Sequence, residues 1–89
     1  MFCYVLESKG SGRLYVGHAA DLDSRLSDHN RGHVASTRGR GPWRVVYSET
    51  FDTRSAAAAR ERELKSWKSP GAIRALFDLL ERPDDREGR

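Results

Sequence analysis

The sequence contains a single cysteine, Cys3, among its 89 residues. One cysteine cannot form a disulfide within the chain, and a zinc site built on several cysteines is excluded as well. No apolar run approaches the ~18 residues that a transmembrane helix requires, and the first residues lack the charged-then-apolar pattern of a signal peptide. We therefore expect a cytoplasmic protein that has no association with a membrane.

Acidic residues are missing from the stretch between His29 and Ser48, although the formal net charge of the whole chain is only +3. Arginine far outnumbers lysine, and four arginines fall in this stretch: Arg31, Arg38, Arg40 and Arg44. Because the planar, forked guanidinium suits phosphate oxygens, the stretch indicates a polyanionic partner. A solvated loop rich in arginine would have the same composition, so charge alone leaves both interpretations open.

The spacing of apolar and turn residues predicts three strands and three helices. Strands are expected at residues 2–6, 13–17 and 43–51. Helices are expected at residues 21–30, 54–67 and from 69 onward. Asp21, Thr53 and Ser69 are the expected N-caps, and Gly32 is expected just beyond the end of the first helix. The polar segment between residues 32 and 42 is expected to be a loop.

The order β-β-α-β-α-α predicts a small α+β fold, in which three helices flank a three-stranded sheet. The two first strands form a hairpin, so at least this part of the sheet is antiparallel. The chain is too short for a second domain, and we expect one domain at residues 1–81. Residues 82–89 are charged and contain no apolar residue, which predicts a disordered tail.

Two polar residues of the first predicted helix lie on its apolar side. On a helical wheel, Arg25 and His29 are four residues apart and fall close to Leu22 and Leu26. They can be functional residues at the margin of the core. They can equally be an arginine whose stem covers apolar surface and a histidine that is hydrogen-bonded at its edge.

The second predicted helix and the hairpin contain comparable residues. Glu61 lies in angle between Ala57 and Leu64, and a carboxylate that points toward a sheet is costly unless a metal or a cation accompanies it. An ordinary i,i+4 ion pair with Lys65 is the simpler explanation. Tyr4 and Tyr15, on neighbouring strands, can be packing residues. Together, however, two phenols, an arginine, a histidine and a carboxylate are the groups that a phosphodiester-cleaving site needs.

These residues occur in motifs whose order and spacing resemble those of the GIY-YIG nuclease domains. The tyrosines belong to F-C-Y at residues 2–4 and Y-V-G at residues 15–17, and Arg25 stands ten residues after Tyr15. His29 follows in R-L-S-D-H-N, and Glu61 opens an E-x-x-L-K segment. The segment S-T-R-G-R-G-P-W-R-V-V-Y, at residues 36–47, is similar to the loop and third strand of small stand-alone bacterial members. The resemblance extends over about residues 1–80.

The resemblance implies a three-stranded antiparallel sheet and an endonuclease that hydrolyses DNA phosphodiester bonds with one divalent cation, Mg²⁺ or Mn²⁺. By position, Glu61 would be the metal ligand and Arg25 would contact the scissile phosphate. Tyr4 or Tyr15 would position or activate the attacking water, and His29 would assist in proton transfer or phosphate binding. His18 stands where some members have a lysine, so it would contact nucleic acid unless it is an ordinary loop histidine.

The sequence departs from the family pattern in the first motif, where Phe2 replaces a glycine and Cys3 an aliphatic residue. We expect no appended DNA-binding domain, so substrate contacts would come from the basic residues: His18, Arg31, Arg38, Arg40 and Arg44. We expect low sequence specificity, a substrate that can be branched DNA or RNA, and a monomer or weak dimer that can require a targeting partner. A role in DNA repair or recombination is expected. The alternative is a nucleic-acid-binding module with weak or lost catalysis.

Overall fold

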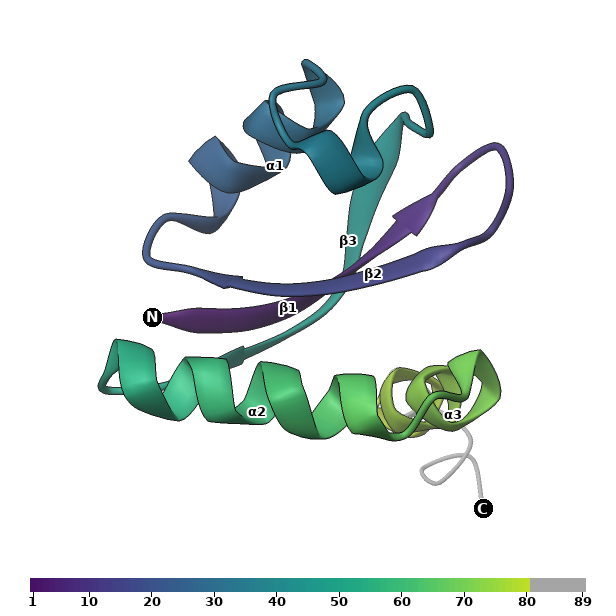
Figure 1. The fold of residues 1–89 in the computed structure, drawn as a ribbon. Helices are drawn as coiled ribbons and strands as arrows, with labels where there is room; N and C mark the ends of the chain where they lie inside the picture. Colours follow the sequence, from purple (N-terminus) through teal and green to yellow (C-terminus); the bar gives the residue numbers. More distant parts are fainter. Residues whose placement is uncertain (81–89) are drawn as a thin grey trace.

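A computed structural model of the chain describes residues 1–80 (Figure 1). Its strands are β1 (Phe2–Ser8), β2 (Leu14–Ala19) and β3 (Trp43–Thr50), and its helices are α1 (Leu22–Asn30), α2 (Arg54–Ser66) and α3 (Pro70–Leu80). A short 3₁₀ helix, η1 (Ala35–Thr37), lies between α1 and β3. The predicted order β-β-α-β-α-α and the α+β class are confirmed. The tail predicted at residues 82–89 lies outside the described residues.

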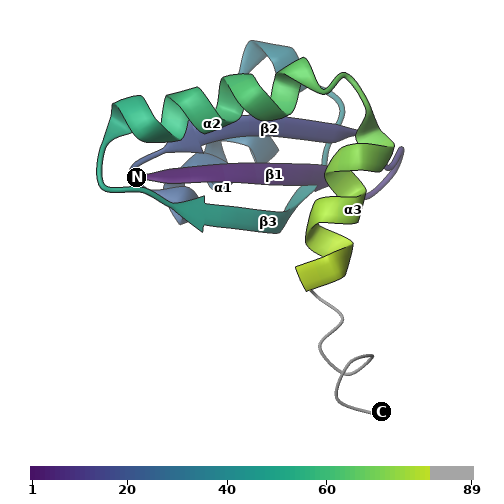
Figure 2. The same cartoon turned by 90° about the horizontal axis from the view of Figure 1, so that it is seen from below.

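The three strands form one antiparallel sheet in the order β2-β1-β3 (Figure 2). The central strand β1 is buried on both faces, which explains why its sequence is a continuous apolar run. In the register between β1 and β2, Tyr4 lies opposite Gly17 and Cys3 lies opposite His18. Because side chains alternate along a strand, these two pairs point to opposite faces of the sheet.

Helices cover both faces of the sheet, α1 and η1 on one side and α2 and α3 on the other (Figure 1). The core on the α1 side contains Tyr4, Leu6 and Trp43, with Tyr15 and Leu26 packed against it. The core on the α2 side contains Cys3, Val5, Val16, Leu64, Ile73 and Phe77. The sheet therefore separates two small cores, and only its edges allow residues from the two sides to meet.

The helix caps are those that the sequence predicts. The side chains of Asp21, Thr53 and Ser69 accept hydrogen bonds from the backbone N–H groups of Ser24, Ala56 and Ala72. These bonds satisfy N–H groups that have no partner within the first turn of each helix. Gly32 follows the end of α1 with φ of 79°, a conformation that favours glycine. None of the helices in residues 1–80 is long and apolar enough to cross a membrane.

The segment between α1 and β3 is more ordered than the predicted polar loop. Asn30 donates a hydrogen bond to the carbonyl oxygen of Trp43 and accepts one from its N–H, which joins the end of α1 to the start of β3. The indole N–H of Trp43 donates to the carbonyl oxygen of Thr37, at 3.3 Å. These contacts hold η1 against the sheet, with the Thr37 side chain almost fully buried.

Candidate active site

A chain of three polar side chains lies buried between the sheet and α1. The hydroxyl of Tyr4 lies 3.0 Å from Nε2 of His29, and Nδ1 of His29 lies 2.8 Å from the hydroxyl of Thr37. All three residues are at most 2% exposed. Burial lowers the pKa of His29, and the positive charge of Arg25 lowers it further, although Asp28 opposes the change. The histidine is therefore held neutral, with both ring nitrogens hydrogen-bonded.

Gly17 makes room for the phenol of Tyr4. A Cβ atom at position 17 would lie 2.6 Å from the Tyr4 hydroxyl oxygen and 2.7 Å from Cζ, which is far inside van der Waals contact. The ring cannot move outward easily because it is buried and hydrogen-bonded to His29. Sterics thus explain the glycine of the Y-V-G motif, since the absence of a side chain lets the Tyr4 ring pass beside β2.

Tyr15 and Arg25 complete the group on this side of the sheet. The Tyr15 ring packs edge-on against His29, with the ring centroids 4.9 Å apart. Burial raises the pKa of Tyr4 to about 12, and the guanidinium of Arg25 beside the phenol partly opposes this rise. The Arg25 side chain is 40% exposed and lies 3.8 Å from Asp28. One edge of the Arg25 guanidinium therefore lies beside the Tyr4 phenol, and the other edge is open to a ligand.

Glu61 and His18 lie on the opposite side, between α2 and β2. Nδ1 of His18 is 2.6 Å from one oxygen of the Glu61 carboxylate, and Nζ of Lys65 is 2.5 Å from the other. Burial alone would raise the pKa of Glu61, but the hydrogen bonds from Lys65 and His18 outweigh it and the pKa is lowered. The carboxylate is consequently a fixed negative charge, and both the i,i+4 pair and a partner from β2 stabilise it.

The two sides meet at the edge of the sheet, along β2. Lys65 reaches from Glu61 to Tyr15, and its Nζ lies 5.7 Å from the centroid of the Tyr15 ring. Burial is the main cause of the raised pKa of Tyr4, and the negative charge of Glu61 makes only a small contribution to it. The structure thus gathers Tyr4, Tyr15, Arg25, His29 and Glu61 around one edge strand, with His18 beside Glu61.

The residues of this site fit a divalent cation that is bound mainly by water and substrate. Within residues 1–80, no group of three or more histidine, cysteine, aspartate or glutamate side chains could hold a metal ion. Mg²⁺ usually keeps several waters and binds to proteins through one or two carboxylates together with substrate phosphates. Glu61, whose side chain is 18% exposed, supplies such a carboxylate. A cation bound there would replace the ion pair with Lys65.

The basic residues predicted to contact nucleic acid do not form one patch. Arg40 lines a groove beside β2, whereas Arg31 lines a smaller hollow near His29 and the Nε of Arg38 donates to the carbonyl oxygen of Gly32. Arg44 lies on the other edge strand, β3, and its guanidinium pairs with Glu7 at 2.6 Å. The structure thus places only Arg40 and His18 close to the edge where the candidate catalytic residues meet.

Thr37 is the part of the site that sequence reasoning missed. It belongs to a segment of exposed polar residues, and nothing in the local pattern distinguishes it from Ser36 beside it. The only available signal was that Trp43, a large apolar residue directly after this loop, must be covered by something. The sequence indicates Lys65 only as a partner of Glu61 in an ion pair, because the contact of Lys65 with Tyr15 depends on how α2 packs on β2.

Residues 1–74 match the GIY-YIG catalytic domain. The chain belongs to the GIY-YIG family. The chain is 45% identical over 67 residues to a UPF0213 protein of Haloquadratum walsbyi, and the match covers 74% of each chain. It is 42% identical over 78 residues to a UPF0213 protein of Staphylococcus saprophyticus, and this match covers 86% of this chain and 94% of that protein.

A solved structure agrees with this assignment. The solution NMR structure of a UPF0213 protein from Bacillus halodurans is 35% identical to the chain, covers 92% of it and 86% of the other chain, and has a TM-score of 0.56. The predicted resemblance and the predicted fold are confirmed. Members of the GIY-YIG family are in general nucleases that act on nucleic acid and typically depend on a divalent metal.

Proposed function

We propose that this protein is an endonuclease that hydrolyses DNA phosphodiester bonds with one divalent cation, Mg²⁺ or Mn²⁺, bound at Glu61. The observation that carries the proposal is the convergence of Tyr4, Tyr15, Arg25 and His29 with a half-buried carboxylate at one sheet edge. A binding module needs cations for phosphate, but it has no use for a fixed negative charge among them. A site that hydrolyses phosphodiesters needs both.

The buried chain from Tyr4 to Thr37 gives His29 a defined role. Thr37 has one hydroxyl proton, and the carbonyl oxygen of Val34 lies 3.4 Å from its oxygen. We assign that proton to Val34, so the hydroxyl oxygen accepts from Nδ1–H of His29. Nε2 is then free of a proton and accepts from the Tyr4 hydroxyl. As the attacking water gives a proton to the Tyr4 oxygen, the phenol proton moves to Nε2 of His29.

The pKa values set the resting protonation of this chain. The pKa of Tyr4, about 12, keeps its phenol protonated near neutral pH, so Tyr4 alone would be a poor base. Burial lowers the pKa of His29, which leaves Nε2 unprotonated and able to accept from the phenol, but it also disfavours the imidazolium. In this proposal Tyr4 therefore passes the proton on, and His29 accepts it only transiently.

Arg25 and Tyr15 bind and orient the substrate in this proposal. The exposed side of the Arg25 guanidinium donates to a phosphate oxygen and stabilises the charge that develops there. Tyr15 is half-buried and lies between His29 and Lys65, so its phenol faces the phosphate from the groove side. A bound divalent cation at Glu61 would supply Lewis-acid stabilisation of the phosphate and of the leaving oxygen.

One observation favours the alternative of a nucleic-acid-binding module with weak catalysis. Both oxygens of Glu61 already have partners at 2.6 and 2.5 Å, so a cation must displace Lys65 or His18. If that displacement is too costly, the site binds a phosphate without cleaving it. We further propose that the protein acts in the cytoplasm during DNA repair or recombination and has low sequence specificity. The single buried cysteine fits a reducing compartment.

The test is a nicking assay on supercoiled plasmid and on branched DNA with Mg²⁺, with Mn²⁺ or with EDTA. Glu61→Gln keeps the size of the side chain and removes its charge, so we expect cleavage to fall by at least about a hundredfold, as for loss of a key transition-state contact. Glu63→Gln is the matched control, because Glu63 lies on the same helix but is 56% exposed and, among residues 1–80, pairs only with Arg60. It should cleave as the unmodified protein does.

The outcomes separate the two candidate functions. Cleavage that needs the divalent ion and is lost in Glu61→Gln but not in Glu63→Gln supports the endonuclease. Binding without cleavage by the unmodified protein supports the binding module. Cleavage that survives in Glu61→Gln at the normal rate would rule out Glu61 as the metal ligand.

A further inference from the structure

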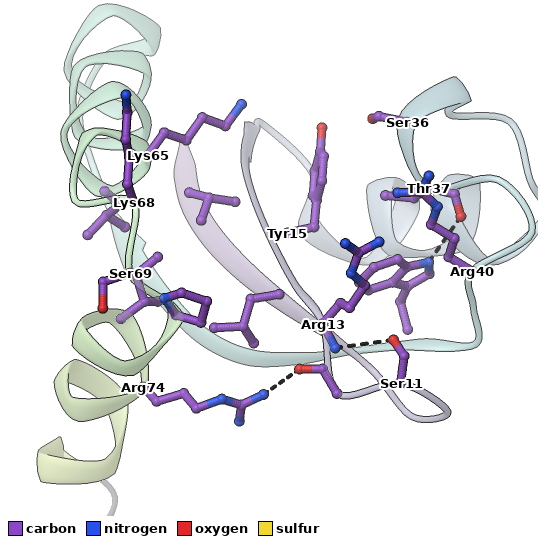
Figure 3. A pocket seen from close by; sticks show the side chains of 17 residues that line it. Ser11, Arg13, Tyr15, Ser36, Thr37, Arg40, Lys65, Lys68, Ser69 and Arg74 are labelled. Carbon is purple, nitrogen blue, oxygen red and sulfur yellow. Dashed lines mark hydrogen bonds between the residues drawn. The ribbon is translucent and has the colours of Figure 1, made fainter.

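A groove runs beside the first half of β2, and Tyr15 is part of its lining (Figure 3). Lys65, Lys68 and Ser69 form one wall, at the junction of α2 and α3, and Ser36, Thr37 and Arg40 form the other (Figure 3). Arg13 and Tyr15 rise from the floor between them. The groove has a volume of about 700 Å³, which is the size of a site for a substantial organic ligand.

The charge on this groove is of one sign. Its lining within residues 1–80 includes Arg13, Arg40, Lys65, Lys68 and Arg74, and no acidic side chain. Arg74 is held by Glu7 and by the carbonyl oxygen of Gly12, so its role is largely structural. In contrast, Arg13, Arg40 and Lys68 form no ion pair with any acidic residue of the described part of the chain. Three unpaired cations on facing walls and floor form a site for a polyanion.

The floor of the groove is apolar as well as charged. Leu14 and the ring of Tyr15 are half-buried there, whereas Val16, Ile73 and Trp43 reach the groove from the core and are at most 7% exposed. Phosphates alone would leave Leu14 and Tyr15 exposed to water, whereas a nucleobase would cover them by stacking and packing. In a duplex the base faces are already stacked inside the helix, so only an unpaired strand can present bases to the floor and phosphates to the walls. A groove with charged walls and an aromatic floor is therefore typical of single-strand binding.

The groove leads directly to the candidate active site. Tyr15 belongs to both, and Lys65 contacts the Glu61 carboxylate at 2.5 Å while its Nζ lies 5.7 Å from the Tyr15 ring centroid. Lys65 is thus the cation at the inner end of the groove. A divalent ion bound at Glu61 would take the place of Lys65, and the ammonium group of Lys65 would then be free to bind the next phosphate of the strand.

We infer that this groove holds a short unpaired DNA strand adjoining the scissile phosphate, with its phosphates on Arg13, Arg40 and Lys68 and its bases against the apolar floor. The inference deepens the proposed nuclease function and rests on it for the identity of the scissile bond. It narrows the substrate class to DNA with a single-stranded segment beside the cut, such as a flap or a gap, and it makes a continuous duplex a poor substrate.

The experiment measures binding rather than cleavage, so that it stands apart from the test of the nuclease. Fluorescence anisotropy in EDTA compares a labelled oligothymidine with a hairpin duplex of equal nucleotide count, over a range of salt concentrations. We expect tighter binding of the oligothymidine. For Arg13→Gln combined with Lys68→Gln, we expect at least a tenfold loss of its affinity. The slope of log affinity against log salt should also become shallower, by about 0.7 for each lost phosphate contact.

Two variants make the test specific to the groove. Arg54→Gln combined with Arg62→Gln removes the same charge from exposed positions of α2 that do not line the groove, and it should leave binding of the oligothymidine nearly unchanged. Arg40→Gln removes a cation from the opposite wall, so a strand that spans the groove must weaken there too. Circular dichroism confirms that each variant is folded.

Several results would overturn the inference. One is equal weakening by the two double variants, which would mean that only total charge matters. Another is binding of the duplex as tightly as the oligothymidine. Single-strand binding that depends on the groove, without cleavage of flap, gap or plasmid DNA in Mg²⁺ or Mn²⁺, would support the groove and contradict the proposed nuclease. Nicking of plasmid by the unmodified protein, combined with groove variants that leave oligothymidine binding unchanged, would support the nuclease and contradict the groove.

Discussion

At the scale of single residues, the site depends on one glycine as much as on any polar group. Gly17→Ala would bring a methyl group within 2.6 to 2.7 Å of the Tyr4 phenol, and the ring would have to leave His29 to avoid it. We expect a loss of about 1–3 kcal/mol in the free energy of unfolding, as for overpacking elsewhere, and a large loss of cleavage by the molecules that remain folded. Urea denaturation and the nicking assay measure the two effects.

Gly10 provides the control for this substitution. It lies in the hairpin turn, has no positive φ, and a Cβ there would meet nothing within 4 Å. Gly10→Ala should change the free energy of unfolding by no more than about 0.5 kcal/mol and leave cleavage intact. If Gly17→Ala behaved like Gly10→Ala, Tyr4 would have room to move and the steric explanation of the Y-V-G glycine would be wrong.

His29 makes stability depend on pH. Its pKa is lowered in the folded protein by burial and by Arg25, against the opposing charge of Asp28, and the other groups that contact its ring are Tyr4, Tyr15 and Thr37. Below the ordinary histidine pKa of 6.5, His29 binds a proton in the unfolded chain but stays neutral in the folded protein until the pH reaches its lowered pKa. The free energy of unfolding therefore falls as pH drops from 6.5 toward the lowered value, by up to about 1.4 kcal/mol per pH unit.

His29→Gln removes this contribution, so the difference in pH dependence between the variant and the unmodified protein isolates it. Urea denaturation at several pH values between neutrality and pH 5 supplies the measurement. The carboxylates with lowered pKa, Glu7, Glu49 and Glu61, lose their contributions only at lower pH, below the ordinary glutamate value of 4.5. If the free energy of unfolding changed with pH in the same way for His29→Gln and for the unmodified protein above pH 5, His29 would not be held neutral.

At the scale of elements, the sequence was sufficient for most of the fold, because its signals are local. Caps at Asp21, Thr53 and Ser69 set the helix starts, and the continuous apolar run at residues 2–6 predicted the first strand, which the structure places at the centre of the sheet. The strand β2 extends two residues beyond the predicted Gly17, because His18 and Ala19 pair with β1. The 3₁₀ helix η1 was not predicted, since its position depends on Trp43 and Asn30, which are close to it only in the folded chain.

The site, like the fold, combines features that local sequence signals predict with features that arise only from contacts in the folded chain. Tyr4, Tyr15, Arg25, His29 and Glu61 were named from motif spacing, and the structure gathers them at one edge. Spacing could not show that the sheet divides them into two groups that meet only along β2, because that depends on which face each strand residue occupies. Nor could it separate Arg40, which lines the groove, from Arg44, which pairs with Glu7 on the other edge strand.

The helix α2 places Glu61, the proposed metal ligand, and we expect its position to depend on packing rather than on its cap. Thr53→Ala removes the hydrogen bond to the Ala56 N–H and should cost about 0.5–2 kcal/mol of stability. Cleavage per folded molecule should be unchanged, because Ala57 and Leu64 are fully buried and hold the helix against the sheet on both sides of Glu61. Denaturation curves measure the stability. The nicking rate at a saturating concentration of folded protein measures cleavage per folded molecule.

Leu64→Ala gives the contrasting case. The side chain of Leu64 is 0% exposed and lies three residues after Glu61, so its loss should cost about 2–5 kcal/mol and allow the helix to shift beside β2. We expect a lower nicking rate even after correction for the unfolded fraction. A Thr53→Ala variant that lost cleavage as severely as Leu64→Ala would place the control of Glu61 at the start of the helix instead.

At the scale of the whole molecule, the site spans both cores. Residues from the α1 side and from the α2 side come together only along β2, so the proposed bound strand would contact η1, β2 and the α2–α3 junction at once. Any ligand that binds the folded form and not the unfolded chain stabilises the fold. The thermal stability of the protein should therefore report binding across the groove, without any cleavage.

We predict that a short oligothymidine in EDTA raises the melting temperature. At a concentration of about a hundred times Kd, binding adds about 2.7 kcal/mol, and for a domain of this size that corresponds to a rise of roughly 10 °C or more. High salt should abolish the rise, because it depends on phosphate contacts with Arg13, Arg40 and Lys68. A hairpin duplex should give a smaller rise. A rise that persists in high salt would mean that bases alone hold the strand, since contacts between cations and phosphates are the part of the binding that salt weakens.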